Sequence, residues 1–218
     1  MSSRRVFLQK VLGISAFALP MFAQAQSQNA AQPSDKKPWR SVNVSEDSKR
    51  VVLFFDFACP YCAKYHKTMF DWAATVPPQV QTLFVPVVNM ADKGRRSEQV
   101  IAAKCYYAAF NLASRGQMAT FLQSVYEQKG SGASLSSKNT WFKALEAARI
   151  NRKSWGAELI KPSLDNAVKY AALKTAQYNL YATPSVAVGG KYVMTPDDVA
   201  GEEAMFYNIL NGLTSEII

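Results

Sequence analysis

The pattern of hydrophobic positions divides the chain into two β-rich parts with a helical part between them. An almost continuous apolar run at 51–57, rich in β-branched and aromatic residues, predicts a strand that is buried on both faces. A second apolar run at 80–88 predicts another strand, and Pro86 within it favours a strand end, an edge or a bulge. A helix is expected between them over 59–74, because Pro77 and its neighbouring proline stop it. This order predicts a parallel strand–helix–strand unit.

The middle of the chain shows helical periodicity and no strand pattern. Apolar residues three or four positions apart predict a helix over 97–114. The residues of its apolar face are Ile101, Cys105, Ala108, Ala109 and Leu112. Further helices are expected over 117–128, 141–149 and 162–178, and the Gly- and Ser-rich stretch 129–137 is expected to be a loop.

A β pattern returns near the end of the chain. Strands are expected over 185–188 and 192–194, and the Gly-Gly-Lys sequence between them is typical of a tight hairpin turn. The sequence Thr-Pro-Asp at 195–197 predicts a helix start, with Thr as N-cap and Pro at the first helical position. A final helix is expected over 202–213. The parallel and antiparallel parts can join as one mixed sheet, which places the chain in the α/β class.

The first residues have the features of an export signal, expected over 1–25. Basic residues precede a short apolar stretch at 11–19, and small residues allow cleavage after Ala25. The segment 3–8 also resembles the twin-arginine export motif, so ordinary and twin-arginine export both remain open, as does an uncleaved anchor. A flexible mature N-terminus is expected over 26–40. Either export route leads to the bacterial periplasm or outside the cell, where disulfides persist.

Composition and charge limit the classes of function that the chain can have. With 218 residues, 49% of them hydrophobic and 19% charged, the chain can form a substantial packed domain, expected over 41–218. The formal net charge is +9; without the three basic residues of the signal, 22 basic residues face 16 acidic ones, a net charge of +6. No basic run is dense enough to predict nucleic-acid binding.

The sequence Cys59-Pro60-Tyr61-Cys62 carries the chemistry. It follows the first strand directly, so the first sulfur is expected at a helix N-terminus and the second one turn inside the helix. The helix dipole favours the thiolate of Cys59, which we expect to be the nucleophile, and Cys62 is the expected resolving thiol that attacks a mixed disulfide and releases the product. Zinc needs four ligands, and only Cys105 and one histidine remain, so no metal is expected. Cys105 is expected to be a core residue.

Three motifs together resemble the DsbA family of periplasmic thiol–disulfide oxidoreductases. They are Phe54 to Cys62 with its cysteine pair, Ala182-Thr183-Pro184-Ser185, and Gly190-Lys191-Tyr192. The resemblance implies a thioredoxin fold, in which a mixed central sheet is flanked by helices, with an α-helical subdomain inserted at about 92–178. It also implies that the redox centre is the Cys59–Cys62 disulfide itself, with no other cofactor.

The resemblance assigns further roles around the pair. Pro60 and Tyr61 form the active-site loop. Thr183-Pro184 matches the family's cis-proline loop, which lies beside the disulfide and binds substrate, and the Thr hydroxyl is expected to tune the redox potential. Proteins of this fold often have a buried carboxylate six residues before the nucleophile, where this chain has Leu53.

Two ionisable residues near the pair are candidate modulators. His66 is the only histidine and lies one helical turn after Cys62. Asp56 lies three residues before Cys59, but the alternation of side chains along a strand gives it the opposite parity to Leu53.

The resemblance leads to three hypotheses about function. The first is a dithiol oxidase that introduces disulfides into unfolded or cysteine-containing exported proteins and is reoxidised by a membrane partner of the DsbB or DsbD type. The second is an isomerase or reductase of the DsbC/DsbG kind, to which Phe55–Cys62, Lys64–His66 and Thr183-Pro184 are more similar. A short N-terminal segment without room for a dimerisation domain favours the first and predicts a monomer. The third is a thioredoxin-fold chaperone, against which the intact cysteine pair argues.

Overall fold

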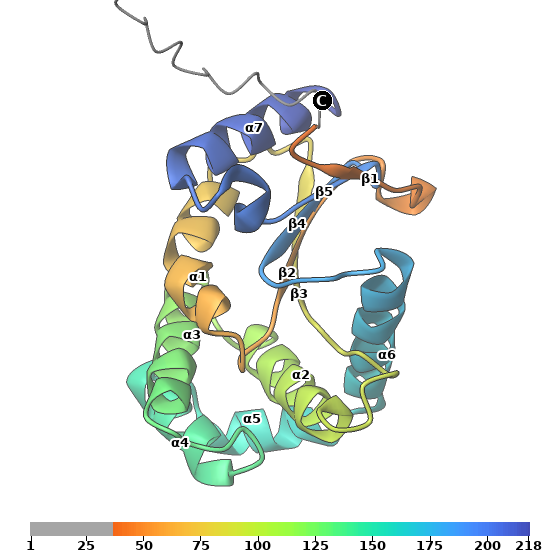
Figure 1. The fold of residues 1–218 in the computed structure, drawn as a ribbon. Helices are drawn as coiled ribbons and strands as arrows, with labels where there is room; N and C mark the ends of the chain where they lie inside the picture. Colours follow the sequence, from red (N-terminus) through yellow and green to blue (C-terminus); the bar gives the residue numbers. More distant parts are fainter. Residues whose placement is uncertain (1–36) are drawn as a thin grey trace, which may run out of the picture. The chain divides into compact units, whose positions relative to one another are not determined.

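A computed structural model describes residues 37–218 (Figure 1). The expected signal peptide, 1–25, and most of the expected flexible segment, 26–40, lie outside the described residues. In the part of the chain that is described, no helix is both long and apolar enough to cross a membrane. Arg40, the last residue of the expected flexible segment, pairs with Val193 at one edge of the sheet.

Five strands form one mixed sheet in the order β1-β5-β4-β2-β3. Their bounds are β1 (Arg40–Ser41), β2 (Arg50–Phe55), β3 (Gln81–Pro86), β4 (Ser185–Val188) and β5 (Tyr192–Met194). Because β2 pairs with β3 in parallel and with β4 in antiparallel, the two predicted β parts do join in one sheet. β3 is an edge strand that ends at Pro86, where the missing amide donor removes no inner ladder bond, so this prediction is confirmed.

Seven α-helices occur within residues 37–218. They are α1 (Pro60–Ala73), α2 (Arg96–Phe110), α3 (Arg115–Gly130), α4 (Lys138–Ala147), α5 (Arg152–Leu159), α6 (Pro162–Gln177) and α7 (Glu203–Ser215). The helices α2 to α6 lie between β3 and β4 in the sequence and form the expected helical insertion. Two short 3₁₀ helices cover Ser45–Asp47 and Pro196–Val199. The second confirms the helix start predicted at 195–197, with Thr195 as N-cap and Pro196 as its first residue.

Two predictions about the insertion were wrong. We expected no helix over Arg152–Leu159, where the central Gly156 weakens the helical pattern. The signal that we missed is Asn151, whose side chain accepts a hydrogen bond from the amide of Ser154 and caps α5. In α2 the predicted apolar face is buried only in its middle; Ile101 is exposed, and so is Leu112, because the helix ends at Phe110.

Helices cover both faces of the sheet (Figure 1). Alternating residues of β2 point to opposite faces, and Val51 and Leu53 pack with α1 and α7. Val52 and Phe54 pack with α2 and α6 on the other face. A third core holds Phe57 and Cys62 with the buried sides of α2, α3, α4 and α5, so the insertion lies over the end of β2. This arrangement brings the insertion to the cysteine pair.

The turn between β4 and β5 depends on glycine. Gly190 has φ +63, and a Cβ built on it would lie 1.9 Å from the backbone oxygen of Val44. The amide of Val44 also donates to the carbonyl of Gly190 at 2.8 Å. The predicted tight turn is confirmed, and its close backbone approach fixes the hairpin against the segment after β1.

Candidate active site

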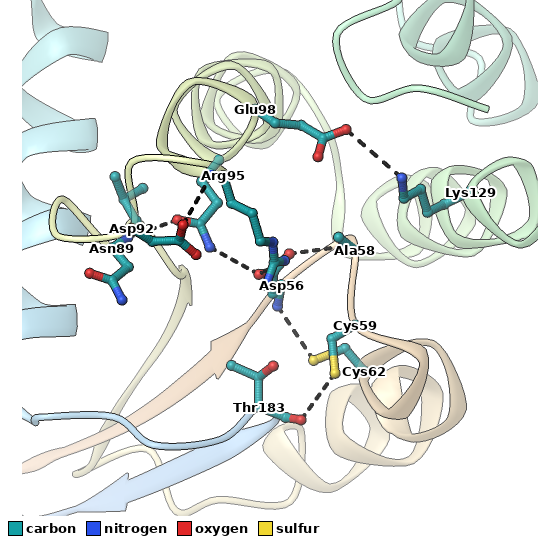
Figure 2. Close-up of polar contacts among 12 residues, drawn as sticks. Asp56, Ala58, Cys59, Cys62, Asn89, Asp92, Arg95, Glu98, Lys129 and Thr183 are labelled. Atoms are coloured by element: carbon teal, nitrogen blue, oxygen red, sulfur yellow. Dashed lines mark hydrogen bonds and ion pairs between the residues drawn. The ribbon is translucent and has the colours of Figure 1, made fainter. Parts of the chain in front are cut away.

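Cys59 lies where β2 passes into α1. It is the N-cap residue of α1, with extended backbone angles of φ −88 and ψ 120. Pro60 follows at the start of the helix, where its missing amide donor costs nothing. The Cys59 sulfur is half-buried, Tyr61 beside it is exposed, and Cys62 is buried one turn into the helix. The strand-to-helix transition therefore leaves Cys59 partly exposed and buries Cys62; Figure 2 shows the two side chains at the start of α1.

The two sulfurs have opposite acid–base properties. A hydrogen bond with the Cys62 thiol is the main cause that lowers the pKa of Cys59 to about 6. The side chain of Thr183 and the backbone amides at the start of α1 lower this pKa further. Together with the bond from Cys62, these hydrogen bonds outweigh partial burial, which raises the pKa. Burial, and then the thiolate of Cys59, raise the pKa of Cys62 far above its ordinary value. At neutral pH the reduced pair is therefore one thiolate and one thiol.

The loop before β4 lies directly against the nucleophile. The peptide bond between Thr183 and Pro184 is cis. In its protonated form, the Cys59 thiol donates a hydrogen bond to the carbonyl oxygen of Thr183, with a sulfur–oxygen distance of 3.1 Å (Figure 2). The sheet register explains this contact, because Ser185 at the start of β4 pairs with Phe54 near the end of β2.

Asp56 holds the turn that precedes Cys59. One oxygen of its carboxylate accepts a hydrogen bond from the amide of Ala58 at 2.8 Å. The other accepts from Arg95 at 2.5 Å (Figure 2) and from Gln99 at 3.1 Å. The backbone amide of Asp56 donates to the sulfur of Cys62 at 3.4 Å. Asp56 therefore links the turn, the start of α2 and the buried thiol.

Sequence reasoning missed Arg95 and Gln99. Both belong to the start of the insertion, about 40 positions after Asp56, and no local pattern pairs them with it. An acidic residue that directly follows a buried strand was the one available signal, because a buried carboxylate requires partners.

His66 is placed near the buried thiol rather than near Cys59. Its Nδ1 lies 2.7 Å from the carbonyl oxygen of Ala63, and its ring lies against that of Tyr126, with centroids 4.9 Å apart. A small cavity is lined by both His66 and Cys62. The structure thus brings His66 and Cys62 together on one side of α1, and it adds Tyr126, which the sequence did not indicate.

Leu53 and Cys105 are both core residues. Leu53 is buried among apolar side chains between β2, α1 and α7. Cys105 is buried in α2, and burial raises the pKa of its thiol to about 12. Within residues 37–218, no three His, Cys, Asp or Glu residues are grouped so that they could hold a metal ion.

Comparisons with known proteins agree with this geometry. A family model described as thioredoxin matches residues 45–205. The thiol:disulfide interchange protein DsbA of Bordetella pertussis is 24% identical over 189 residues, which cover 84% of this chain and 86% of that protein. The crystal structure of Pseudomonas aeruginosa DsbA superposes with a TM-score of 0.66 at 14% identity, over 83% of this chain and 92% of the other. The crystal structure of Xylella fastidiosa DsbA superposes with a TM-score of 0.63 at 19% identity, over 82% of this chain and 94% of the other. The expected thioredoxin fold with a helical insertion is confirmed.

Proposed function

We propose a function from one premise: the chain belongs to the thioredoxin family. It is a DsbA-like thiol–disulfide oxidoreductase, and in this proposal it acts as a dithiol oxidase. Its redox centre is the Cys59–Cys62 disulfide, which it passes to unfolded or cysteine-containing exported proteins. The observation that carries the proposal is the contrast between the two sulfurs, because Cys59 has a pKa of about 6 and Cys62 is buried with a strongly raised pKa.

The contrast favours the oxidase direction. A lowered pKa stabilises the thiolate of Cys59, which exists only in the reduced protein. Stabilising the reduced form makes the disulfide a stronger oxidant, and it also makes Cys59 a better leaving group. A reductase would instead need its disulfide form to be the more stable one.

The reaction consists of two thiol–disulfide exchanges. A substrate thiolate attacks the sulfur of Cys59, so that a mixed disulfide forms and Cys62 leaves and takes up a proton. A second substrate thiolate then attacks the substrate sulfur of the mixed disulfide and releases Cys59 as a thiolate. Two electrons pass from the substrate sulfurs to the pair, and the substrate gains the disulfide bond. Attack by Cys62 on the mixed disulfide is the reverse of the first step, and it frees substrates that fail to complete the second.

Thr183 and Pro184 supply the substrate-binding loop in this proposal. The carbonyl oxygen of Thr183 lies against the reacting sulfur, and Tyr61 offers an exposed ring beside it. An extended substrate segment that passes between them would place its own sulfur at Cys59.

The cellular setting is part of the proposal. The signal-like sequence of residues 1–25 supports export to the periplasm. The relatives named DsbA support a cycle in which a membrane partner of the DsbB or DsbD type reoxidises the pair. We expect the mature protein to act as a monomer.

The decisive measurement is the reduction potential of the Cys59–Cys62 pair at equilibrium with glutathione. The oxidase proposal expects a value close to that of strong periplasmic oxidants, about −120 mV, and a value near −270 mV would overturn it in favour of a reductase. Oxidation of reduced, unfolded ribonuclease tests the activity directly. Cys59→Ser should abolish it, whereas Cys105→Ser, which changes a core thiol outside the pair, should retain it. Refolding of scrambled ribonuclease would identify an isomerase, and the oligomeric mass tests the monomer.

A further inference from the structure

The buried thiol must exchange a proton each time the pair changes state. In the proposed function, on which this inference rests, Cys62 leaves as a thiolate when the mixed disulfide forms. It lies 1% exposed beneath the surface, so bulk water does not reach its sulfur directly. Leu53 of β2, at the position where proteins of this fold often have a buried carboxylate, is apolar and cannot hold a proton.

A cavity beside Cys62 has room for one water molecule. Its volume is about 20 Å³, and a single water needs about 10–15 Å³ on the same measure. Apolar side chains form most of its wall, and the polar or ionisable residues in the wall are Cys62, His66 and Tyr126.

Tyr126 of α3 has a buried hydroxyl with no hydrogen-bond partner within the described chain. The side chain is 5% exposed, and its ring packs against those of His66 and Phe57. The charges of Cys62, Asp56 and Cys59 add to burial in raising the pKa of Tyr126. A buried hydroxyl normally finds a partner, and a water in the adjoining cavity would supply one.

His66 connects the cavity to the outside. Its Nδ1 lies 2.7 Å from the carbonyl oxygen of Ala63 and must donate to it, so in the neutral ring Nε2 is the acceptor. The same residue lines an open groove of about 410 Å³ between α1 and α3, together with Lys67 and Asp71. His66 is the ionisable residue that the cavity and the groove share.

We propose that Tyr126 and a water in this cavity relay a proton between the sulfur of Cys62 and Nε2 of His66. When substrate attacks Cys59, the breaking disulfide bond leaves its electron pair on Cys62. The water gives a proton to this sulfur and takes one from the Nε2–H of the protonated ring, and Tyr126 holds the water through its hydroxyl. His66 then regains its proton from solvent in the groove. In the reverse direction the proton leaves Cys62 by the same path.

Other ionisable groups lie near this path, and the test must distinguish their effects on the rate from those of His66 and Tyr126. Asp56 follows β2 and is paired with Arg95, the N-cap residue of α2. Tyr106 of α2 is fully buried, and burial raises its pKa. Lys67 and Asp71 pair with each other on the groove side. None of these residues lines the cavity, whose ionisable lining residues are Cys62, His66 and Tyr126.

The test is the rate at which dithiothreitol reduces the oxidised protein, followed from pH 5 to 8 and corrected for the thiolate fraction of the reagent. Tyr126→Phe removes one oxygen and should slow the reaction about 10-fold or more, because general acid catalysis contributes about 10²–10⁴-fold. Tyr107→Phe is the control: it changes a half-buried tyrosine of α2 that does not line the cavity, and it should leave the rate unchanged. His66→Ala should slow the reaction, and added imidazole, which can enter by the groove, should restore the rate.

The outcomes separate the relay from the function on which it rests. Wild-type rates in both Tyr126→Phe and His66→Ala would overturn the relay while leaving the oxidase proposal intact. If the wild-type pair itself fails to oxidise a dithiol, the proposed function fails first. Because Tyr126→Phe is nearly isosteric, its unfolding curve and its rate together decide the case even if His66→Ala does not fold.

Discussion

The thiol of Cys59 and the carbonyl oxygen of Thr183 lie 3.1 Å apart, although 124 residues separate them in the sequence. This contact joins the start of α1 to the loop before β4. Since β2 and β4 are antiparallel neighbours, the loop is held at the nucleophile by the sheet itself. Thr183 is therefore the residue outside the Cys59–Cys62 motif that is best placed to change the chemistry of Cys59.

Thr183→Val should make the pair a weaker oxidant. The Thr183 side chain helps to lower the pKa of Cys59, whereas the carbonyl contact belongs to the backbone and survives the change. The loss of one hydrogen bond, about 1 kcal/mol, should raise the pKa of Cys59 by about half a unit to one unit. The reduction potential should fall by up to about 30 mV. Thiolate absorbance as a function of pH measures the first effect and glutathione equilibrium the second.

Thr75→Val is the matched control for this change. Its hydroxyl donates to the carbonyl of Trp72 at the end of α1, far from the pair along the helix. The control should keep the wild-type pKa of Cys59. An unchanged pKa in Thr183→Val would instead show that the hydroxyl does not act on the thiolate.

The reduction potential should depend on pH with a change of slope near pH 6. Below the pKa of Cys59, reduction takes up two protons with two electrons, and the potential falls by about 59 mV per pH unit. Above it Cys59 stays a thiolate while Cys62, whose pKa is strongly raised, still takes a proton, so the slope should decrease to about 30 mV per unit. A single slope of about 59 mV from pH 5 to 8 would contradict the lowered pKa.

Asp56→Asn should destabilise the protein and loosen the turn before Cys59. The carboxylate accepts one charge-assisted hydrogen bond from Arg95 and another hydrogen bond from Gln99, and the neutral amide replaces one acceptor oxygen with a donor. We expect a loss of about 1–3 kcal/mol in the free energy of unfolding. Urea unfolding measures it. Asp71→Asn, which breaks an exposed pair with Lys67, should cost less than about 1 kcal/mol, and equal costs would contradict a special role for Asp56.

Lys174→Met should weaken the attachment of α6 to the segment before β2. Lys174 is buried and pairs with Asp47 at 2.7 Å and with Glu46 at 3.2 Å. Asp47 is fully buried, so removing the ammonium leaves its charge with Arg50 and the hydroxyl of Tyr178, at a cost of about 3 kcal/mol.

Lys104→Met offers the comparison for Lys174→Met. It breaks a pair with the exposed Asp165 and should change the unfolding free energy by less than about 1 kcal/mol. Thermal or urea unfolding of both variants tests the difference. A small effect in Lys174→Met would mean that the buried cluster contributes little to holding α6.

The features that the sequence predicted well are those set by neighbouring residues. The apolar run of β2, the proline after Cys59 and the helical pattern of α1 together place the cysteine pair at a helix start. The turn at Gly190 and the position of Pro86 follow in the same way, because backbone angles and missing donors act within a few residues.

Local patterns also explain where prediction failed. Helix α5 has only eight residues and a central glycine, so its periodicity is weak and its N-cap at Asn151 is the main signal. In α2 the pattern predicted a helix correctly but extended its buried face to Ile101 and Leu112. Which residues of a helix are covered depends on the neighbours that pack on it.

The sequence by itself therefore determined the fold class and the position of the cysteine pair, because both depend on residues close together in the chain. Only the tertiary structure decided what surrounds the two sulfurs. Arg95 and Tyr126 reach the site because the insertion packs over the end of β2. Thr183 reaches it because β4 pairs with β2. Contacts of this kind depend on how distant segments pack, which no pattern within a single helix or strand records.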